Sequence, residues 1–567
     1  MKKLLSILLA VLMLAAIAFS CVACGGEKEP PETTTGKNDD TAPPATEKLP
    51  DEPTSTESET EKLIASESES QESASVTEPA TDTEPASSSE DATEPVTPPD
   101  TETTSMEDMY PKSPTYADLD YGGKEFKIVY VWAPSTLKPS GYGATYDIFE
   151  NPDNPDEALT AAAALRVNLI STYYNCKVTG VPAVEAMSVC NAAIDSGSAE
   201  YDLCLGSGSV SSYIGGNRYY NILNLIDPSK DYWDQALIRD LAFGGKLYEI
   251  TGDMSTSDDG GYWVLFFNKD ILAEHNLENP YELVMNKKWT IDKMMEMAAS
   301  VATDLDGDDK ISNANGKDIF GFITHGDHAR SAWIACGLRL ASPVNADGRY
   351  TIAAETNANG QDIFQKVLDL MWADFTGYAN HQVNMGVPEG LRAVFIANRA
   401  LFYGECLGNI GEPRGEYIGV GLGLKDYENL NFGILPQPMY NEDQGQYYSF
   451  NRTGCCYGVP STCNIEIASS FIDLWAFHGQ QTVQKTNFEQ IAYAWTSDPE
   501  VVDMMKIITS SAVWDAGYFL DAASLDNNLI ADINANKNRY ASRLKSGGPK
   551  LLASFNKYCD DVAKFDH

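Results

Sequence analysis

The sequence predicts an α/β fold with an open, mostly parallel sheet. Short apolar runs alternate with helical periodicity through the first part of the body of the chain, which is the pattern of strand–helix–strand units. The chain has 567 residues, 43% of them hydrophobic, and its body from about residue 121 is long enough for two domains. Beyond the N-terminal leader, no apolar stretch reaches the length of a membrane-spanning helix.

The predicted elements follow in the order strand, helix, strand, helix, strand. They cover residues 126–132, 157–174, 176–180, 184–195 and 202–205, and Asn-Pro-Asp before residue 157 suits a helix start. Ligands of such sheets bind at the carboxyl ends of the strands. Trp132, Ser207 and Ser209 follow two of these strands and therefore mark a candidate site.

The chain opens with a secretory signal. Lys2 and Lys3 precede an apolar run, and small residues surround Cys21 and Cys24, so residues 1–24 are predicted to be a signal peptide. The junction resembles the lipobox of bacterial lipoproteins, in which the cysteine left after cleavage carries lipid. Cys24 fits better than Cys21, and an ordinary signal peptide with chance cysteines is the alternative.

Residues 25–115 are predicted to be a disordered acidic stalk. Between residues 27 and 108 there are 24 acidic residues against four lysines, set among Ser, Thr, Pro and Ala. Such a segment cannot bury enough apolar surface to offset its ordering entropy. The net charge of −42 divides into −20 for this segment, +2 from Lys2 and Lys3, and −24 for the body. An acidic tail for a basic partner is the alternative.

Several motifs carry a family resemblance through almost the whole body. Phe267-Asn268-Lys269-Asp270 stands directly before a predicted helix, within residues 261–272. Further landmarks lie at residues 244–250, 277–292, 400–404, 431–438 and 452–478. In this order and spacing, the chain resembles the family 1 extracellular solute-binding proteins of ABC importers, in the branch common in clostridia.

The resemblance implies a two-lobed, periplasmic-binding-protein-like fold of type II with hinge crossovers between the lobes. It assigns the solute-binding domain to residues 116–567. Lobe 1 would hold about 121–263 and 431–497, and lobe 2 about 264–430 and 498–567. A solute held between the lobes would favour a closed form that a permease can recognise.

The implied function is that of a lipid-anchored receptor on the extracellular face of the cell membrane. Its partners would be a sugar or oligosaccharide and the permease subunits of an ABC importer, with the lipid as its only membrane contact and the protein a monomer. No enzyme is implied, and the sequence has no Gly-x-Ser-x-Gly elbow, Walker loop or dinucleotide fingerprint. The acidic body disfavours nucleic acid. A surface adhesin or sensor input with the same fold is the alternative, which the long stalk favours.

The candidate solute site combines aromatic platforms with polar groups, as sugar sites do. Position in the predicted elements, or the place where relatives offer an aromatic residue, selects the candidates. They are Trp132, Ser207, Ser209, Trp263, Trp333, Tyr403, Glu405, Trp514 and Asp515. For each tryptophan a core position is the alternative. Trp289 is assigned to the core, because it precedes a predicted helix cap at Thr290.

A calcium site is predicted in an acidic loop. Carboxylates stand at positions 1, 3 and 5 and a main-chain carbonyl at position 7, as in the first two-thirds of an EF-hand loop. The loop departs at position 6, where Asp309 replaces Gly, and at position 12, where Asn replaces Glu. The candidate ligands are Asp304, Asp306, Asp308, Lys310, Asn315 and Asp318. The ion would be structural, and a plain acidic surface loop is the alternative.

Two other groups of residues, the histidines and the cysteines, give weaker indications of a functional site. His325 and His328 lack the helical spacing of a zinc-binding HExxH motif and are expected to be exposed loop residues. The nine cysteines of the body form no CxxC or zinc pattern, and a single disulfide among Cys455, Cys456 and Cys463 is left open.

Overall fold

The computed structural model describes most of the body of the chain, and the described residues belong to one compact unit, Pro99–His567. They are residues 105–132, 147–150, 157–207, 215–314, 316–343, 348–380, 389–411, 423–452, 455–496, 498–520 and 524–565. The predicted signal peptide, Cys24 and nearly all of the stalk lie outside them.

The first sheet has four strands in the order β12-β3-β1-β2. Its members are β1 (Lys124–Val131), β2 (Cys176–Ala183), β3 (Leu203–Ser207) and β12 (Cys455–Gly458). β1 is parallel to β2 and β3, whereas β12 is antiparallel to β3. The helices packed on this sheet include α3 (Glu157–Tyr173), α4 (Ala186–Asp195) and α14 (Ile465–Gly479). The five elements predicted between residues 126 and 205 are thereby confirmed.

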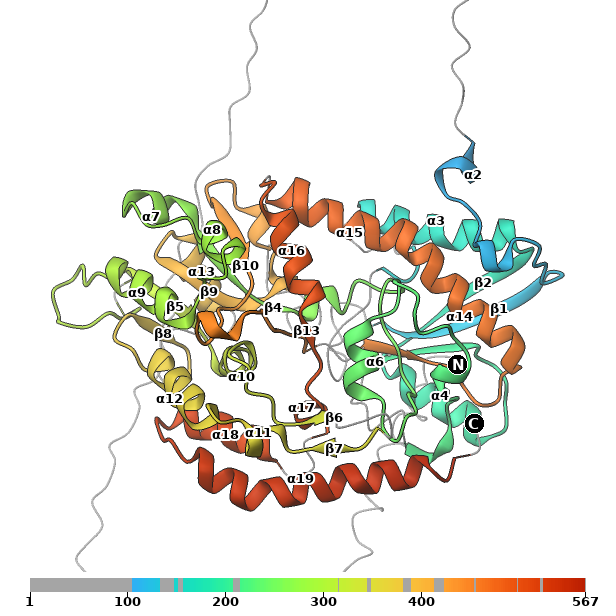
Figure 1. Cartoon of the computed structure of the whole chain (residues 1–567). Helices are drawn as coiled ribbons and strands as arrows, with labels where there is room; N and C mark the ends of the chain where they lie inside the picture. The colour runs from blue at the N-terminus through green and yellow to red at the C-terminus, as the bar shows by residue number, and fades with distance from the viewer. Residues whose placement is uncertain are drawn as a thin grey trace, which may run out of the picture. The chain divides into compact units, whose positions relative to one another are not determined.

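The second sheet has five strands in the order β10-β4-β9-β5-β8. Its members are β4 (Trp263–Asn268), β5 (Phe320–Thr324), β8 (Thr376–Tyr378), β9 (Ala400–Cys406) and β10 (Phe432–Leu435). β5 is parallel to β8 and β9, whereas β4 is antiparallel to β9 and β10. β4 is buried along its whole length, which explains why its sequence is almost entirely apolar. Figure 1 shows the two sheets on opposite sides of the view.

Helices surround the second sheet and the junction between the sheets. They are α7 (Lys269–Glu274), α8 (Pro280–Met285), α9 (Ile291–Val301), α10 (Gly326–Ala335), α11 (Ala353–Thr356), α12 (Gly360–Met371), α13 (Glu389–Ile396), α16 (Val501–Ser510), α17 (Ala516–Phe519), α18 (Leu525–Asn534) and α19 (Tyr540–Val562). α2 (Met106–Met109), α6 (Gln235–Leu241) and α15 (Lys485–Glu489) belong to the rest of the chain. Trp289 is buried and Thr290 caps α9 by accepting from the Lys293 N–H, so both predictions are confirmed.

The chain passes between the two sheets at the carboxyl ends of their strands. Trp263, the first residue of β4, pairs with Cys406 at the end of β9. Cys455, the first residue of β12, pairs with Ser207 at the end of β3. Both crossings therefore lie where ligands of such sheets bind. The predicted α/β class, with two lobes joined by crossing segments, is confirmed.

One predicted lobe boundary is placed too early along the chain. Residues 431–450 were assigned to lobe 1, but β10 forms four backbone-paired positions with β4 in the second sheet. The chain rejoins the first sheet only at β12. The physical reason is that an antiparallel edge strand of the second sheet comes before the crossing segment, and an apolar run of this length looks alike in either sheet.

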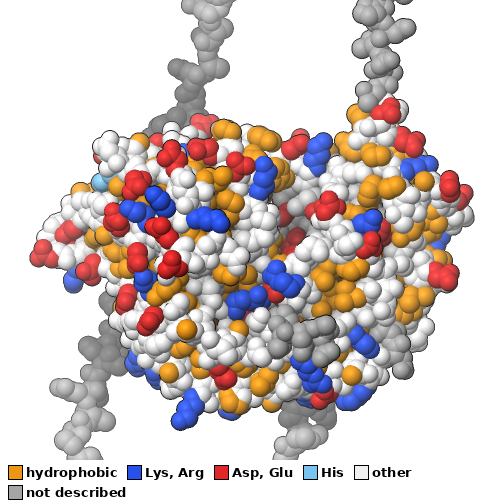
Figure 2. All heavy atoms as spheres, viewed as in Figure 1, with side chains coloured by type: hydrophobic (Ala, Val, Ile, Leu, Met, Phe, Trp, Pro, Cys, Tyr) orange, Lys and Arg blue, Asp and Glu red, His pale blue; other side chains and the backbone are white. Residues whose placement is uncertain are grey.

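The described residues contain no helix long and apolar enough to cross a membrane. On the face drawn in Figure 2, Lys and Arg side chains are interspersed with Asp and Glu. That face thus offers no continuous basic surface of the kind that nucleic acid requires. No disulfide bond is found among the nine described cysteines, which include Cys463.

Gly321 supplies a test of the packing between β5 and α9. A Cβ at this position would lie 2.1 Å from the Ala298 carbonyl oxygen, so the strand or the helix would have to move. We expect Gly321→Ala to lower the free energy of unfolding by about 1–3 kcal/mol, the usual cost of overpacking. Chemical denaturation measures it. Gly260→Ala is the control, because the nearest neighbour of its Cβ would lie at 3.6 Å. Equal stability of the two variants would contradict the close approach.

Candidate functional site

The strand ends of the first sheet bring Trp132 to the predicted position. It follows β1, its backbone N–H donates to the Ala183 carbonyl oxygen at 3.0 Å, and its side chain is half-buried. Ser207 ends β3, where it pairs with Cys455. Ser209 lies outside the described residues. Trp132 is therefore the predicted aromatic residue that keeps exposed surface beside a strand end.

The corresponding end of the second sheet holds a buried ion pair. His325 follows β5, Glu405 lies near the end of β9, and their Nε2 and Oε2 atoms are 3.1 Å apart. Burial would raise the pKa of Glu405. The charge of His325 and hydrogen bonds from His325 and the Cys406 N–H outweigh burial and hold the pKa below its usual value. Glu405 is fully buried, so this carboxylate is satisfied by the protein and offers no oxygen to a solute in this structure.

The predicted exposure of the two histidines in the His-Gly-Asp-His sequence is wrong. They were expected in an exposed loop, but His325 is 5% exposed and His328 is fully buried. His328 lies in α10, with its ring 5.8 Å from that of Trp263 and 5.3 Å from that of Phe322. Burial lowers its pKa to about 3. Their burial could not be predicted from the sequence, because it depends on the pairing of the preceding strand, β5, within the second sheet.

Three of the other predicted aromatic residues lie in the core. Trp263, Trp333 and Tyr403 are at most 1% exposed. Trp263 packs against His325, Trp333 against Phe364 and Tyr403 against Phe266. These predictions are wrong, because large apolar rings on β4, β9 and α10 fill the space between the sheet and the helices that cover it. They present no face to a solute in this structure.

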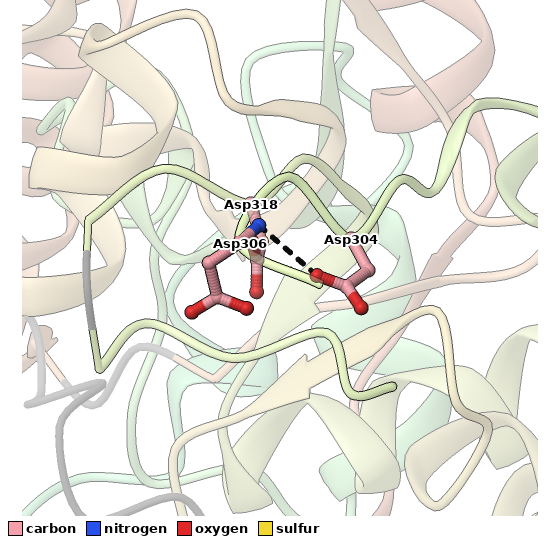
Figure 3. A group of neighbouring side chains, drawn as sticks. All are labelled: Asp304, Asp306 and Asp318. Atoms are coloured by element: carbon pink, nitrogen blue, oxygen red, sulfur yellow. Dashed lines mark hydrogen bonds between the residues drawn. The ribbon is translucent and has the colours of Figure 1, made fainter. Parts of the chain in front are cut away.

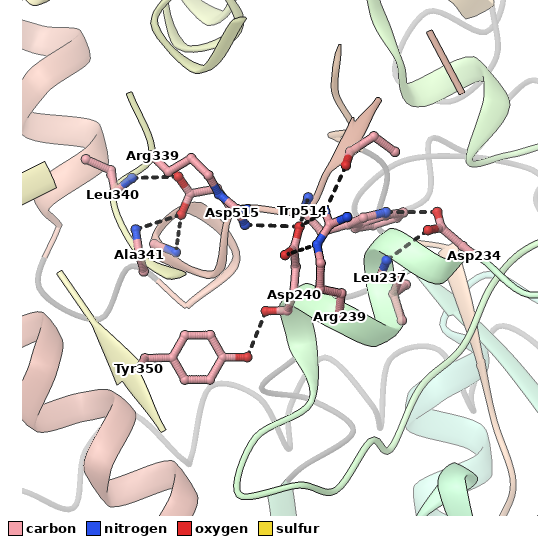
Figure 4. Close-up of polar contacts among 12 residues, drawn as sticks. Asp234, Leu237, Arg239, Asp240, Arg339, Leu340, Ala341, Tyr350, Trp514 and Asp515 are labelled. Carbon is pink, nitrogen blue, oxygen red and sulfur yellow. Dashed lines mark hydrogen bonds and ion pairs between the residues drawn. The ribbon is translucent and has the colours of Figure 1, made fainter. Parts of the chain in front are cut away.

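Trp514 and Asp515 form part of a polar network at the junction, which Figure 4 shows. Trp514 Nε1 donates to Asp234 Oδ2 at 2.9 Å, and its backbone N–H donates to Asp240 Oδ2 at 3.1 Å. Asp515 accepts from the N–H groups of Leu340 and Ala341 at 2.7 and 3.1 Å. Both predicted site residues are buried and do not face a solute. Trp514 connects the chain before α17 to α6, whereas Asp515 connects it to the segment after α10.

The same network holds two arginines. Asp240 is fully buried at its carboxylate and pairs with Arg239 at 2.7 Å and with Arg339 at 3.0 Å. Arg239 also donates to the Ala512 carbonyl oxygen at 2.9 Å. The two positive charges near this point are therefore already partnered.

A pocket of about 490 Å³ lies beside this network. It is lined by α6 and the residues before it, by the segment that leads into β4, and by residues of α15 and α16. Five of its lining residues are aspartates, Asp231, Asp234, Asp253, Asp258 and Asp259. No local pattern in the sequence indicates this pocket, because its lining residues come from three separated stretches of the chain, 231–239, 252–262 and 484–510.

Burial raises the pKa values of three carboxyl groups around this pocket. It raises the pKa of Asp253 to about 8 and that of Asp259 to about 6, with neighbouring aspartates adding to both. It raises the pKa of Asp258 well above its usual value, again with Asp259 as the next cause. These groups are costly to ionise without a cation nearby.

The acidic loop brings together three of the predicted calcium ligands. Carboxylate oxygens of Asp304, Asp306 and Asp318 all lie within 4.8 Å of one another, as Figure 3 shows for their side chains. This is the one such group found among the described residues. Asp308 does not join it, and Asn315 lies outside the described residues. The backbone of Asp309 has φ of +62°, the left-handed conformation that glycine adopts at position 6 of an EF-hand loop.

Hydrogen bonds hold this loop in shape. Asp304 accepts from the N–H groups of Asp306, Gly307 and Asp309. Asp318 accepts from Leu305 at 3.0 Å and from Ser312 at 2.9 Å. A carboxylate oxygen has two lone pairs, so these bonds leave room for a cation. Hard oxygen ligands in this arrangement suit Ca²⁺.

Comparison with known proteins gives similarity to solved structures alone. No protein-family model and no curated protein matches the chain. A sugar transporter from Rhizobium etli in an open conformation has 14% identity and a TM-score of 0.49, covering 77% of this chain and 99% of its own. The maltose/maltodextrin-binding domain MalE from Bdellovibrio bacteriovorus, bound to maltotriose, has 14% identity and a TM-score of 0.40, covering 78% and 100%. RafE from Streptococcus pneumoniae has 12% identity and a TM-score of 0.47, and the match covers 77% of this chain and 98% of RafE.

Two buried glutamates with opposite pKa shifts give a pH test. Burial raises the pKa of Glu249 from 4.5 to about 8, and its Oε1 has no hydrogen-bond partner among the described residues. Its contribution to stability is complete below about pH 4 and is lost as pH rises through 8, with a slope of up to about 1.4 kcal/mol per pH unit. We expect Glu249→Gln to be more stable than the natural chain at pH 9, as measured by denaturant unfolding.

The control is Glu405→Gln, because the pKa of Glu405 is lowered. Its contribution is present above the ordinary glutamate value and is lost as pH falls, so this variant should be less stable than the natural chain at neutral pH. The same direction of change in both variants would contradict the assigned environments.

Proposed function

We propose that the chain is the solute receptor of an ABC importer, which captures a sugar or oligosaccharide between its two lobes and delivers it to a membrane permease. The observation that carries this proposal is the position of the crossings. Both lie at the carboxyl ends of strands, at β3 in one sheet and at β9 in the other. A solute at this junction would contact both lobes at once, and its binding would favour their closure.

The choice of a carbohydrate rests on the family resemblance of residues 244–292 and 400–438. Trp132 supports it, as a half-buried aromatic side chain at the end of β1. The anchoring of the chain through Cys24, the extracellular location, the permease partner and the absence of enzymatic activity belong to the same proposal. A receptor tethered by a long acidic stalk could still fold back to reach its permease.

The experiment is thermal unfolding of the mature chain against mono- and oligosaccharides. A ligand that binds only the folded state stabilises it by about 2.7 kcal/mol at a hundredfold excess over its dissociation constant. We expect a selective rise of Tm with one class of sugar. If no sugar raises Tm, the carbohydrate assignment is wrong and the adhesin or sensor function takes its place.

Variants of Trp132 locate the effect. If a ring stacked on a sugar face contributes about as much as an aromatic pair, 0.5–1.5 kcal/mol, Trp132→Ala should weaken binding of the active sugar by roughly two- to tenfold. Isothermal titration calorimetry measures the change. Tyr493→Ala is the control, because Tyr493 is an aromatic residue 59% exposed elsewhere on the surface. An equal loss in both variants would argue against a site at the end of β1.

We also propose that the acidic loop binds a structural Ca²⁺ through Asp304, Asp306 and Asp318. Calcium should raise Tm of the mature chain, and Asp306→Asn should remove most of that rise, because it deletes one charged ligand. Asp362→Asn, at an exposed position of α12, is the control. If calcium raises Tm of the Asp306→Asn variant as much as that of the natural chain, the loop does not bind calcium and is a plain acidic surface loop.

A further inference from the structure

The last helix of the chain contacts both lobes at points away from the crossing segments. α19 packs against α18, α12 and α11 of the second lobe, and in Figure 1 it runs from α18 along the lower edge toward the C-terminus. Its end reaches Gly244-Gly245-Lys246, a motif of the first lobe that the proposed solute site does not use. We propose that this motif is a clasp for the end of α19, which holds the two lobes in one arrangement when no solute is bound.

The first half of α19 is anchored in the second lobe. Arg543 Nε donates to Asp532 Oδ2 of α18 at 2.7 Å, and the Asp532 side chain is fully buried. The ring of Tyr540 stacks on that of Phe364 in α12, with their centroids 5.4 Å apart. A charge-assisted pair and a stacked ring therefore fix this half of the helix in the second lobe.

The end of α19 is bound to the first lobe by hydrogen bonds. Lys246 Nζ donates to the carbonyl oxygens of Val562 and Phe565 at 2.9 and 2.8 Å. The last carbonyl groups of a helix have no partner within it, and a lysine beside them both satisfies them and complements the helix dipole. The ring of Phe565 also packs edge-on against Tyr248, at 5.8 Å between centroids. Lys246 thus caps a helix that begins in the other lobe.

The residues after Lys246 are held within the first lobe. The Leu247 carbonyl oxygen accepts from the Ile222 N–H, and the Leu247 N–H donates to Asn221 Oδ1 at 2.9 Å. Ile250 forms an antiparallel bridge with Tyr457 of β12, a strand of the first sheet. The contact of α19 with the clasp therefore joins this helix to the first sheet.

Glycines let three stretches of backbone meet at the clasp. Gly244 and Gly348 have φ of +59° and +64°, and the Gly244 N–H donates to the Gly348 carbonyl oxygen at 3.1 Å. A Cβ on Gly348 would lie 2.2 Å from the Gly245 nitrogen, and one on Gly244 would lie 3.1 Å from Val562 Cγ2 of α19. Because a side chain at Gly348 would force the backbones apart, glycine there permits the close approach.

An apolar contact stabilises the clasp beyond its hydrogen bonds. The ring of Phe243 stacks on that of Tyr350 with centroids 4.5 Å apart, and Phe555 of α19 lies 5.1 Å from Tyr350. All three side chains are at most 3% exposed. Their burial against one another adds a hydrophobic contribution to the contact between the lobes.

A proline marks the point at which α19 can bend. Pro549 lies inside the helix, directly after Gly547 and Gly548. Proline has no N–H to donate to the preceding turn, and helices kink where it occurs. This point separates the half of α19 that is anchored in the second lobe from the half that the clasp holds. The clasp can therefore release while the first half stays in place.

This inference deepens the proposed function and rests on it, because it concerns the movement of the two lobes around a solute. A fastening away from the crossings makes every other arrangement of the lobes less populated. A solute that favours another arrangement must then supply the difference from its own binding free energy. The clasp would thus regulate how tightly the receptor holds its solute.

Hydrogen exchange of the full mature chain measures how often the clasp opens. Lys246→Met keeps the apolar stem and removes both hydrogen bonds to the helix end. We expect the amides of residues 550–562 to exchange about tenfold faster in this variant, the effect of losing a hydrogen bond from a charged group, with those of residues 525–546 unchanged. Lys246→Arg, which retains a cationic donor, should exchange like the natural chain. Lys557→Met is the control, because Lys557 is exposed on α19 and pairs with Asp561 of the same helix.

Single-molecule energy transfer between the lobes tests whether the clasp holds them. Fluorophores are attached through azide-bearing amino acids at Val189 of α4 and Met285 of α8, which are 39% and 56% exposed. Without solute, the natural chain should give one narrow distribution of transfer efficiencies. A double variant, Lys246→Met with Phe565→Ala, should give a second or a broader distribution, because the end of α19 is released from the first lobe.

The proposal is overturned if the double variant, folded by circular dichroism, keeps the distribution of the natural chain. It is also overturned if Lys557→Met changes the exchange of residues 550–562 as much as Lys246→Met does. If Lys246→Met does not fold, the natural chain decides. Weaker protection of residues 550–562 than of residues 525–546 supports the clasp, and equal protection overturns it. These measurements contain no solute, so their failure and a failure of the sugar panel are separate results.

Discussion

The hydrogen bonds of Asn451 hold the junction on which the arrangement of the two sheets depends. Asn451 is fully buried and forms an antiparallel bridge with Tyr262. Its N–H donates to the Val513 carbonyl oxygen at 3.1 Å, and its Nδ2 donates to that of Asp258 at 2.9 Å. One residue thus joins three stretches of chain from different parts of the sequence. Because buried backbone groups must be paired, these stretches have little freedom to separate, and the strand ends of both sheets stay opposite one another.

Buried charged groups have partners within each lobe, whereas several buried carboxyl groups at the junction have no cationic partner among the described residues. In the first lobe, Arg166 donates to the carbonyl oxygens of Met254, Asp147 and Ile148 and lies 3.8 Å from the ring of Trp475. In the second lobe, Arg330 pairs with Asp526, and Glu405 pairs with His325. Each of these charges has partners that offset its desolvation. The carboxyl groups that lack them gather near the crossing segments. Burial raises the pKa of Asp253 and Asp258 among them. Carboxyl groups with strongly shifted pKa values are found most often at functional sites.

The predicted elements illustrate how far local pattern reaches. The strand at Lys124–Val131 and the helices and strands up to Ser207 follow from periodicity, because each element is encoded by neighbouring residues. The capped helix after Thr290 follows for the same reason. The site residues were harder to predict. A tryptophan has the same local sequence whether it faces a solute or fills the core. Trp263 at the start of β4 and Trp333 in α10 both fill the core.

The sequence by itself determined the α/β class, the order of the elements and the acidic loop at Asp304, because these depend on residue types at short spacing. The tertiary structure alone decided the membership of β10 in the second sheet, the pairing of His325 with Glu405 across 80 residues, and the gathering of aspartates around one pocket. The physical reason is that burial and pairing depend on which distant segments pack together. That packing minimises exposed apolar surface and unpaired polar groups over the whole fold, and no single stretch of sequence records it.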